Sequence, residues 1–124
     1  MKLVSNVDCG NAPKKQFVLD FTIAFVKADI KTILEMLDDN AEWNMVGTKI
    51  IKGKEGIRTE LESIDLKEAQ LLKIENILSH GKLCSANGEI HYPNSNIAFC
   101  NAYTFTSHSK VAKIKTLKSY SISI

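Results

Sequence analysis

The sequence predicts an α+β fold in which helices pack on one face of a curved, mixed, mostly antiparallel sheet. Apolar residues at helical spacing are confined to the N-terminal half. In most of the remaining sequence apolar and polar residues alternate, as they do in strands. Runs of strands separated from helices are typical of α+β proteins. With 124 residues, 44% of them hydrophobic, the chain is long enough for one domain with a real core.

The expected order is helix, helix, two strands, helix and four strands, giving about six strands and three helices. Residues 1–11 are expected to form a flexible arm, and residues 12–124 a single domain. Pro13 fits the first turn of a helix, and Asp29 can cap the next helix. Residues 38–40 are expected to form a turn. The predicted helices cover residues 13–28, 30–37 and 54–64, and the predicted strands cover 41–46, 48–52, 68–79, 83–92, 97–106 and 110–124.

The two strands within residues 83–106 define the sheet best. If Tyr92 pairs with Ile97, large apolar residues fall on one face and small or polar residues on the other. The smaller side chains of the second face are typical of a surface that a second sheet approaches closely. In this register Asn101 lies on the apolar face opposite Gly88. A buried amide needs hydrogen-bond partners, so Asn101 is either a structural residue or the polar anchor of a pocket.

The two ends of the strand region have less regular patterns. The alternation of residues 68–79 breaks around Glu75, which predicts a β-bulge. In the last strand, Tyr120 shares the phase of Ala112, Ile114 and Thr116, and is therefore expected to point inward. Lys118 interrupts that phase.

Composition argues against several classes of function. A net charge of +2 is too small to imply a nucleic-acid partner. No run reaches the ~20 apolar residues of a membrane span. Three cysteines do not form a disulfide framework, and no cysteine–histidine cluster has metal-ligand spacing, so we expect a cytoplasmic protein without a metal or cofactor.

Four segments, in their order and spacing, resemble the nuclear transport factor 2-like (NTF2-like) superfamily, especially its SnoaL-like branch. The segments are Ala28-Asp29-Ile30, Asp39-Asn40-Ala41-Glu42-Trp43, Gly53-Lys54-Glu55-Gly56-Ile57 and Asn101-Ala102-Tyr103-Thr104-Phe105. The resemblance covers nearly the whole chain. It implies a cone-shaped sheet closed by three helices, a pocket inside the cone, and a homodimer.

Ketosteroid isomerase, a member of this superfamily, uses an Asp base and an oxyanion hole made of a Tyr and a protonated Asp. Similarity places Phe21 at the Tyr, Met45 or Asn44 at the base, and Asn101 at the second oxyanion residue. Phe21 has no hydroxyl, and neither Met45 nor Asn44 can take a proton near neutral pH. Only the Asn101 amide can still donate a hydrogen bond, so the resemblance implies that this proton-transfer machinery is absent.

Three functions remain open after these arguments. The first is a homodimer, paired through the outer sheet face, whose cones bind a small, mainly apolar molecule. The second is an isomerase-, cyclase- or hydrolase-type enzyme with a different acid or base, for which Asp20, Glu75 and His91 are candidates. The third is an assembly domain with a filled cone. The expected ligand-binding residues are Asn101, Tyr103, Phe21, Trp43, Met45, Phe99, Phe105 and Tyr120.

Overall fold

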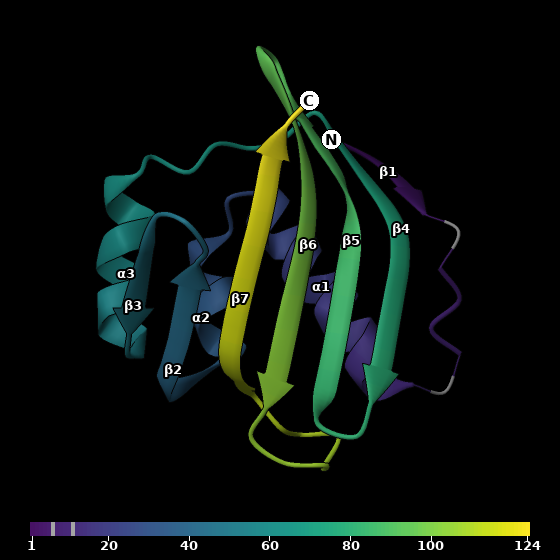
Figure 1. Ribbon diagram of the computed structural model, residues 1–124, viewed down its shortest axis with the longest axis vertical. Coiled ribbons are helices and arrows are strands. Elements are labelled where there is room, and N and C mark those ends of the chain that lie inside the picture. Colours follow the sequence, from purple (N-terminus) through teal and green to yellow (C-terminus); the bar gives the residue numbers. More distant parts are fainter. Residues whose placement is uncertain (6, 11) are drawn as a thin grey trace.

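The computed structural model has one mixed seven-stranded sheet with three helices packed behind it (Figure 1). It describes residues 1–5, 7–10 and 12–124. The helices are α1 (Pro13–Val26), α2 (Ile30–Glu35) and α3 (Lys54–Ser63). The strands are β1 (Lys2–Ser5), β2 (Leu37–Met45), β3 (Lys49–Lys52), β4 (Leu71–His80), β5 (Leu83–Tyr92), β6 (Ser95–Phe105) and β7 (Ile114–Ser123). The predicted α+β class is confirmed, with one strand more than the expected six.

The additional strand is β1, which comes from the segment that was expected to be a flexible arm. The strand order is β1-β4-β5-β6-β7-β2-β3. Pairing is parallel between β1 and β4 and between β2 and β7, and antiparallel elsewhere. Because β1 has only four residues, all of them half-buried or exposed, its sequence carries no clear strand pattern. No helix in the described part of the chain is long and apolar enough to cross a membrane.

Local sequence accounts for the helix boundaries. Pro13 begins α1, where its missing N–H leaves no intrahelical bond unmade. Ala28 follows α1 with a φ of 58°, a left-handed conformation that stops the helix two residues before the expected end. The Asp29 side chain caps α2 by accepting a hydrogen bond from the Thr32 N–H at 3.2 Å. Residues 38–40 lie within β2 rather than in a turn, at the place where the β2–β7 register shifts.

The β5–β6 register differs from the prediction by two residues. Tyr92 pairs with Ser95, so only Pro93 and Asn94 form the turn. The turn is two residues shorter than predicted, and β6 is displaced along β5 by two residues. A shift of two residues preserves the faces, because side chains alternate with a period of two. Asn101 therefore stays on the inner face, but it lies opposite Ala86 instead of Gly88.

The predicted bulge in β4 is present between Ile74 and Asn76. Gly88 of β5 lies opposite Ile74, and a Cβ atom at this glycine would come within 1.9 Å of the Lys73 carbonyl oxygen. A backbone atom cannot move aside as a flexible side chain can, so the close approach of the two strands requires glycine here.

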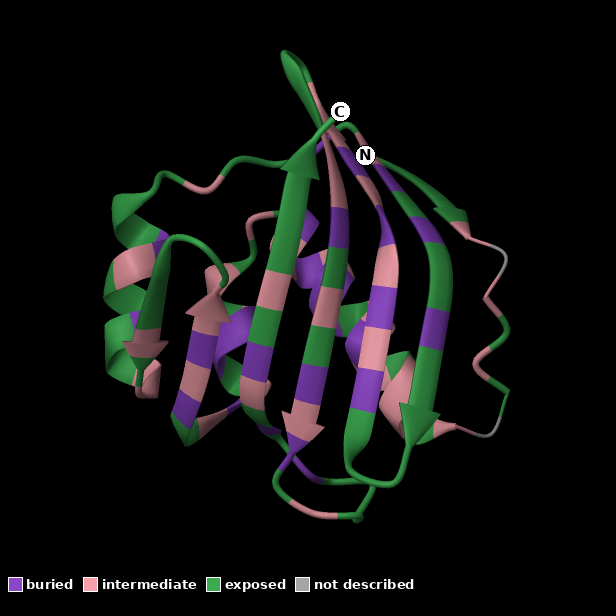
Figure 2. Ribbon diagram, in the orientation of Figure 1, coloured by how far each residue is buried: buried purple, intermediate pink, exposed green. Residues whose placement is uncertain are grey.

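The phase predicted for β7 is wrong from Thr116 onward. A register irregularity between Thr104 and Phe105 of β6 changes which β7 residues face inward. Leu117 is buried, and Tyr120 is 46% exposed on the outer face. Figure 2 shows the resulting bands of buried and exposed residues along the strands. We use the term outer face for the side of the sheet turned away from the helices.

Candidate functional site

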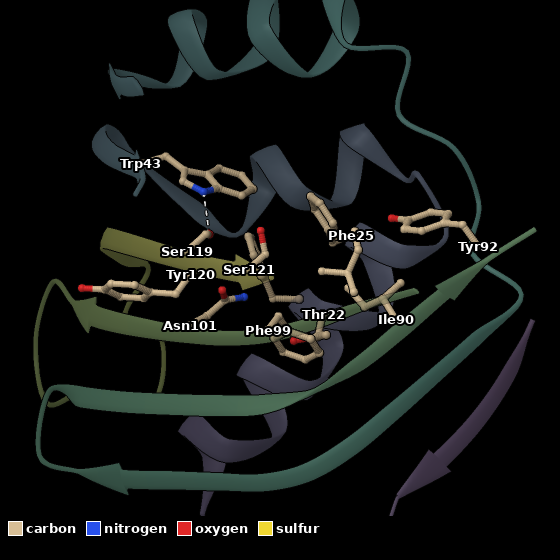
Figure 3. Close-up of a pocket in the computed structure, with 12 residues that line it drawn as sticks. Thr22, Phe25, Trp43, Ile90, Tyr92, Phe99, Asn101, Ser119, Tyr120 and Ser121 are labelled. Atoms are coloured by element: carbon tan, nitrogen blue, oxygen red, sulfur yellow. Dashed lines mark hydrogen bonds between the residues drawn. The ribbon is translucent and has the colours of Figure 1, made fainter. Parts of the chain in front are cut away.

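A cavity of about 150 Å³ lies between α1 and the inner face of the sheet (Figure 3). Residues of α1, β2, β5, β6 and β7 surround it. The lining residues are Phe21, Thr22, Phe25, Trp43, Ile90, Tyr92, Ile97, Phe99, Asn101, Ser119, Tyr120 and Ser121. We refer to this cavity as the pocket. Most of its wall is aromatic or aliphatic, with a small number of hydroxyl and amide groups.

Burial differs between the two ends of the pocket. Phe21, Thr22 and Trp43 are at most 3% exposed and form its closed end. Ile97 is half-buried and Ser121 is exposed, so this part of the lining forms the mouth. A molecule entering past Ser121 therefore passes from solvent into an apolar interior.

Four of the eight predicted binding residues line the pocket with inward side chains: Asn101, Phe21, Trp43 and Phe99. Tyr120 lies at its border, but the side chain points to the outer face because of the changed phase of β7 (Figure 3). Tyr103 is buried behind the lining, where its ring packs edge-on against Phe21 at a centroid distance of 6.0 Å.

Phe105 and Met45, which were also predicted, lie outside the lining. Phe105 packs edge-on against Phe17 at a centroid distance of 5.3 Å, with the Lys14 ammonium 5.5 Å from the ring centroid. It is therefore part of the core nearer the end of β6. Met45 is half-buried at the end of β2. Phe105 and Met45 both face the inner side of the sheet, as strand alternation predicts. They lie outside the lining because the cavity extends along only part of the sheet.

Sequence reasoning missed seven lining residues: Thr22, Phe25, Ile90, Tyr92, Ile97, Ser119 and Ser121. Phe25 lies one helical turn after Phe21, so the spacing of α1 carried a signal for it. Ser119 and Ser121 were hidden by the phase error in β7. The signal for them was the interruption of the predicted phase at Lys118, which reflects the register irregularity between β6 and β7.

Two side-chain hydrogen bonds organise the polar part of the pocket. The Trp43 indole N–H donates to the Ser119 hydroxyl oxygen at 2.9 Å (Figure 3). The Asn101 amide nitrogen donates to the Tyr103 hydroxyl oxygen at 3.3 Å. Asn101 and Ser119 are also direct partners across the β6–β7 ladder. The amide predicted as a lone polar anchor is therefore part of a group of polar side chains.

Burial affects the two tyrosines around the pocket. Removal from water disfavours the phenolate and raises the pKa of Tyr103 to about 12, while the hydrogen bond from Asn101 acts in the opposite direction. Burial also raises the pKa of Tyr92. Both hydroxyls are therefore neutral near physiological pH, and they act as hydrogen-bonding groups rather than as bases.

The candidate acids and bases lie away from the pocket. Asp20 is exposed and accepts a hydrogen bond from Gln16 at 2.9 Å, and Glu75 is exposed on the sheet. His91 contacts Glu89 at 2.9 Å on the outer face, and this hydrogen bond lowers the pKa of the Glu89 carboxyl. Among the twelve lining residues none is Asp, Glu, His, Lys, Arg or Cys.

Cysteine and metal chemistry gain no support from the geometry. Burial raises the pKa of the Cys84 thiol to about 11, which disfavours the nucleophilic thiolate. Within residues 1–5, 7–10 and 12–124, no group of three or more His, Cys, Asp or Glu side chains is placed to hold a metal ion.

No protein-family profile matches the chain, and no curated protein matches it in sequence. Solved structures do match it. An NTF2-like protein of unknown function from Cytophaga hutchinsonii has 22% identity and a TM-score of 0.70, over 87% of this chain and 98% of that one. The chain has the NTF2-like fold. The predicted cone-type architecture is thereby confirmed.

Two further structures with this fold have different descriptions. A SnoaL-like protein from Shewanella putrefaciens has 15% identity and a TM-score of 0.74, over 92% of this chain and 83% of that one. An LEH-like epoxide hydrolase from M. tuberculosis has 18% identity and a TM-score of 0.69, over 89% and 83% of the two chains. Similarity at this level shows a shared fold, and the fold hosts several activities.

The raised pKa of Tyr103 predicts a pH-dependent contribution to stability. A folded-state pKa of about 12 lies above the ordinary tyrosine pKa of 10.0, so the contribution is complete below pH 10 and is lost as the pH rises toward 12. Raising the pH from about 9 to about 11.5 should lower the free energy of unfolding of the wild type by roughly 2 kcal/mol more than that of Tyr103→Phe. Urea unfolding of both proteins at each pH measures this difference. Equal losses in the two proteins would mean that Tyr103 titrates like a solvated phenol.

Proposed function

We propose that the pocket binds a small, mainly apolar molecule and that Asn101 orients one polar group on it. The main support is the composition of the lining, in which aromatic and aliphatic walls surround the Asn101 amide and the Ser119 hydroxyl. Ligand sites commonly combine an apolar lining with a small number of placed polar groups. The predicted walls Phe21, Trp43 and Phe99 contribute to this lining.

The volume of the pocket limits what it can hold. A cavity of about 150 Å³ has the size of an engineered apolar cavity known to bind benzene, and it is smaller than the roughly 300–1,000 Å³ of most ligand pockets. The ligand is therefore a compact molecule of about benzene size, or a larger molecule that inserts only one end past Ser121.

The lining favours binding over acid–base catalysis of the isomerase type. General acid–base catalysis needs a titratable group within hydrogen-bond reach of the substrate. Asp20, Glu75 and His91 lie outside the lining, and the pKa of Tyr92 is raised away from neutrality. The similarity to an epoxide hydrolase concerns the fold. A filled assembly domain is disfavoured by the open volume beside Asn101.

Toluene provides a direct test, because Trp43 is the only tryptophan of the chain and it lines the pocket. Titration with toluene should change the Trp43 fluorescence saturably. Ser121→Phe places a bulky side chain at the mouth and should raise the dissociation constant by about tenfold or more. The matched control is Ser123→Phe on the same strand, also exposed but outside the lining, and its dissociation constant should stay at the wild-type value. A signal that never saturates, or an equal loss in both variants, would contradict a binding pocket.

We also propose that two copies of the chain pair through the outer face of the sheet. Several large apolar side chains are exposed on this face: Leu78, Leu83, Tyr120 and Ile122, at 64%, 57%, 46% and 71%. Ala102 and Cys100, also exposed on the outer face, are small enough to let a second sheet approach. A second copy would bury a surface that is costly to leave in water.

The pairing proposal predicts a dimer of twice the chain mass of 13.8 kDa by analytical ultracentrifugation. Ile122→Lys should raise the dimer dissociation constant by about tenfold or more, because it puts a charge into the apolar contact. The control is Val111→Lys, which changes a residue 79% exposed outside the strands and should leave the dimer intact. A monomeric wild-type protein at high micromolar concentration would rule out this pairing.

We propose that the protein is located in the cytoplasm, which is a reducing compartment. Cys9, Cys84 and Cys100 are free thiols. Cys84 is buried on the inner side and Cys100 is exposed on the outer face, so the sheet separates them. We infer that the fold does not depend on oxidation of its thiols.

A further inference from the structure

We propose that the pocket selects a hydrogen-bond donor, so that its ligand is a small, mainly apolar alcohol or phenol rather than a ketone or a carboxylate. This inference rests on the proposed function, because it assigns the chemistry of the group bound beside Asn101. It depends on which end of the Asn101 carboxamide faces the cavity. The hydrogen bond between Asn101 and Tyr103 determines that orientation.

The Asn101 side chain is held by one hydrogen bond. Its amide nitrogen donates to the Tyr103 hydroxyl oxygen at 3.3 Å. Tyr103 is 2% exposed and its ring packs edge-on against Phe21 of α1, so the position of this hydroxyl is fixed by the core. The Asn101 nitrogen is therefore directed at Tyr103.

The Asn101 carbonyl oxygen is left on the cavity side. No side-chain or main-chain donor within residues 1–5, 7–10 and 12–124 is bonded to it. In the same part of the chain, every fully buried side-chain nitrogen or oxygen atom has a partner, so this oxygen is accessible from the cavity. This orientation differs from the expectation that Asn101 offers its N–H to a ligand, because Tyr103 engages the amide nitrogen.

Ser119 supplies a complementary group next to this acceptor. The Trp43 indole is a donor only, so the Ser119 oxygen accepts its hydrogen bond and Ser119 keeps its own hydrogen for another partner. Directly opposed residues on antiparallel strands have Cβ atoms about 4.5–5.5 Å apart. Asn101 and Ser119 are such a pair, so one atom in the cavity can reach both side chains.

A ligand hydroxyl satisfies both groups at once. It accepts from Ser119 and donates to the Asn101 oxygen. A ketone accepts from Ser119 but leaves the Asn101 oxygen without a donor, and an unpaired polar group weakens binding. A carboxylate places negative charge against the Asn101 oxygen. The hydroxyl is therefore the group that fits the pocket.

Cyclohexanol and cyclohexanone form a matched pair of probes, with one oxygen each on rings of nearly equal size. Their dissociation constants can be measured from the backbone amide shifts of Phe99 and Ser119 in ¹H–¹⁵N spectra. Cyclohexanol should bind about tenfold more tightly than cyclohexanone to the wild-type protein. Tyr103→Phe removes the acceptor that holds the amide nitrogen, so the carboxamide can turn. The ratio of the cyclohexanone to the cyclohexanol dissociation constant should then fall to about twofold or less. In Asn101→Leu the two probes should bind equally.

The outcomes separate this inference from the proposed function. If toluene saturates the pocket and the alcohol shows no advantage over the ketone, binding stands and donor selection is wrong. If the ketone binds more tightly, the carboxamide has the opposite orientation. If toluene, cyclohexanol and cyclohexanone all fail to saturate, the proposed function fails together with this inference. The ratio of the two dissociation constants in the wild-type protein tests donor selection even if a variant does not fold.

Discussion

The hydrogen bond from the Asn101 amide nitrogen to the Tyr103 hydroxyl is the constraint on which the polar part of the pocket depends. An amide on the inner face of a sheet is costly unless it is paired. Here Tyr103 pairs its nitrogen, and the cavity leaves its oxygen accessible. The Tyr103 ring also packs against Phe21 of α1, so packing of the helix on the sheet helps to fix the partner of the binding group.

Much of the fold could be predicted because its signals are local. Helical spacing identified α1 and α3, turn chemistry located the β5–β6 hairpin, and a break in alternation located the bulge of β4. The inner position of Asn101 survived an error of two residues in the register, because side-chain direction repeats every two residues. Phe21, Trp43 and Phe99 were found because each belongs to an apolar face of its own helix or strand.

The missed features depend on pairing between distant strands. The irregularity where β6 meets β7 leaves only one mark in the β7 sequence, the interruption of the apolar phase at Lys118, yet it turns Tyr120 outward and Ser119 inward. The strand β1 owes its place to pairing with β4, and its own four residues carry little pattern. The partner of Asn101 was within reach of the sequence, because Tyr103 lies two residues along the same face of β6.

Neutron diffraction from a crystal exchanged into D₂O tests the central claim most directly, because it distinguishes the ND₂ group of Asn101 from its carbonyl oxygen. The account predicts deuterium density between the Asn101 nitrogen and the Tyr103 oxygen, carried by the nitrogen. A Tyr103 deuteron directed at an Asn101 oxygen would contradict it, because the carboxamide would then present its N–D groups to the cavity.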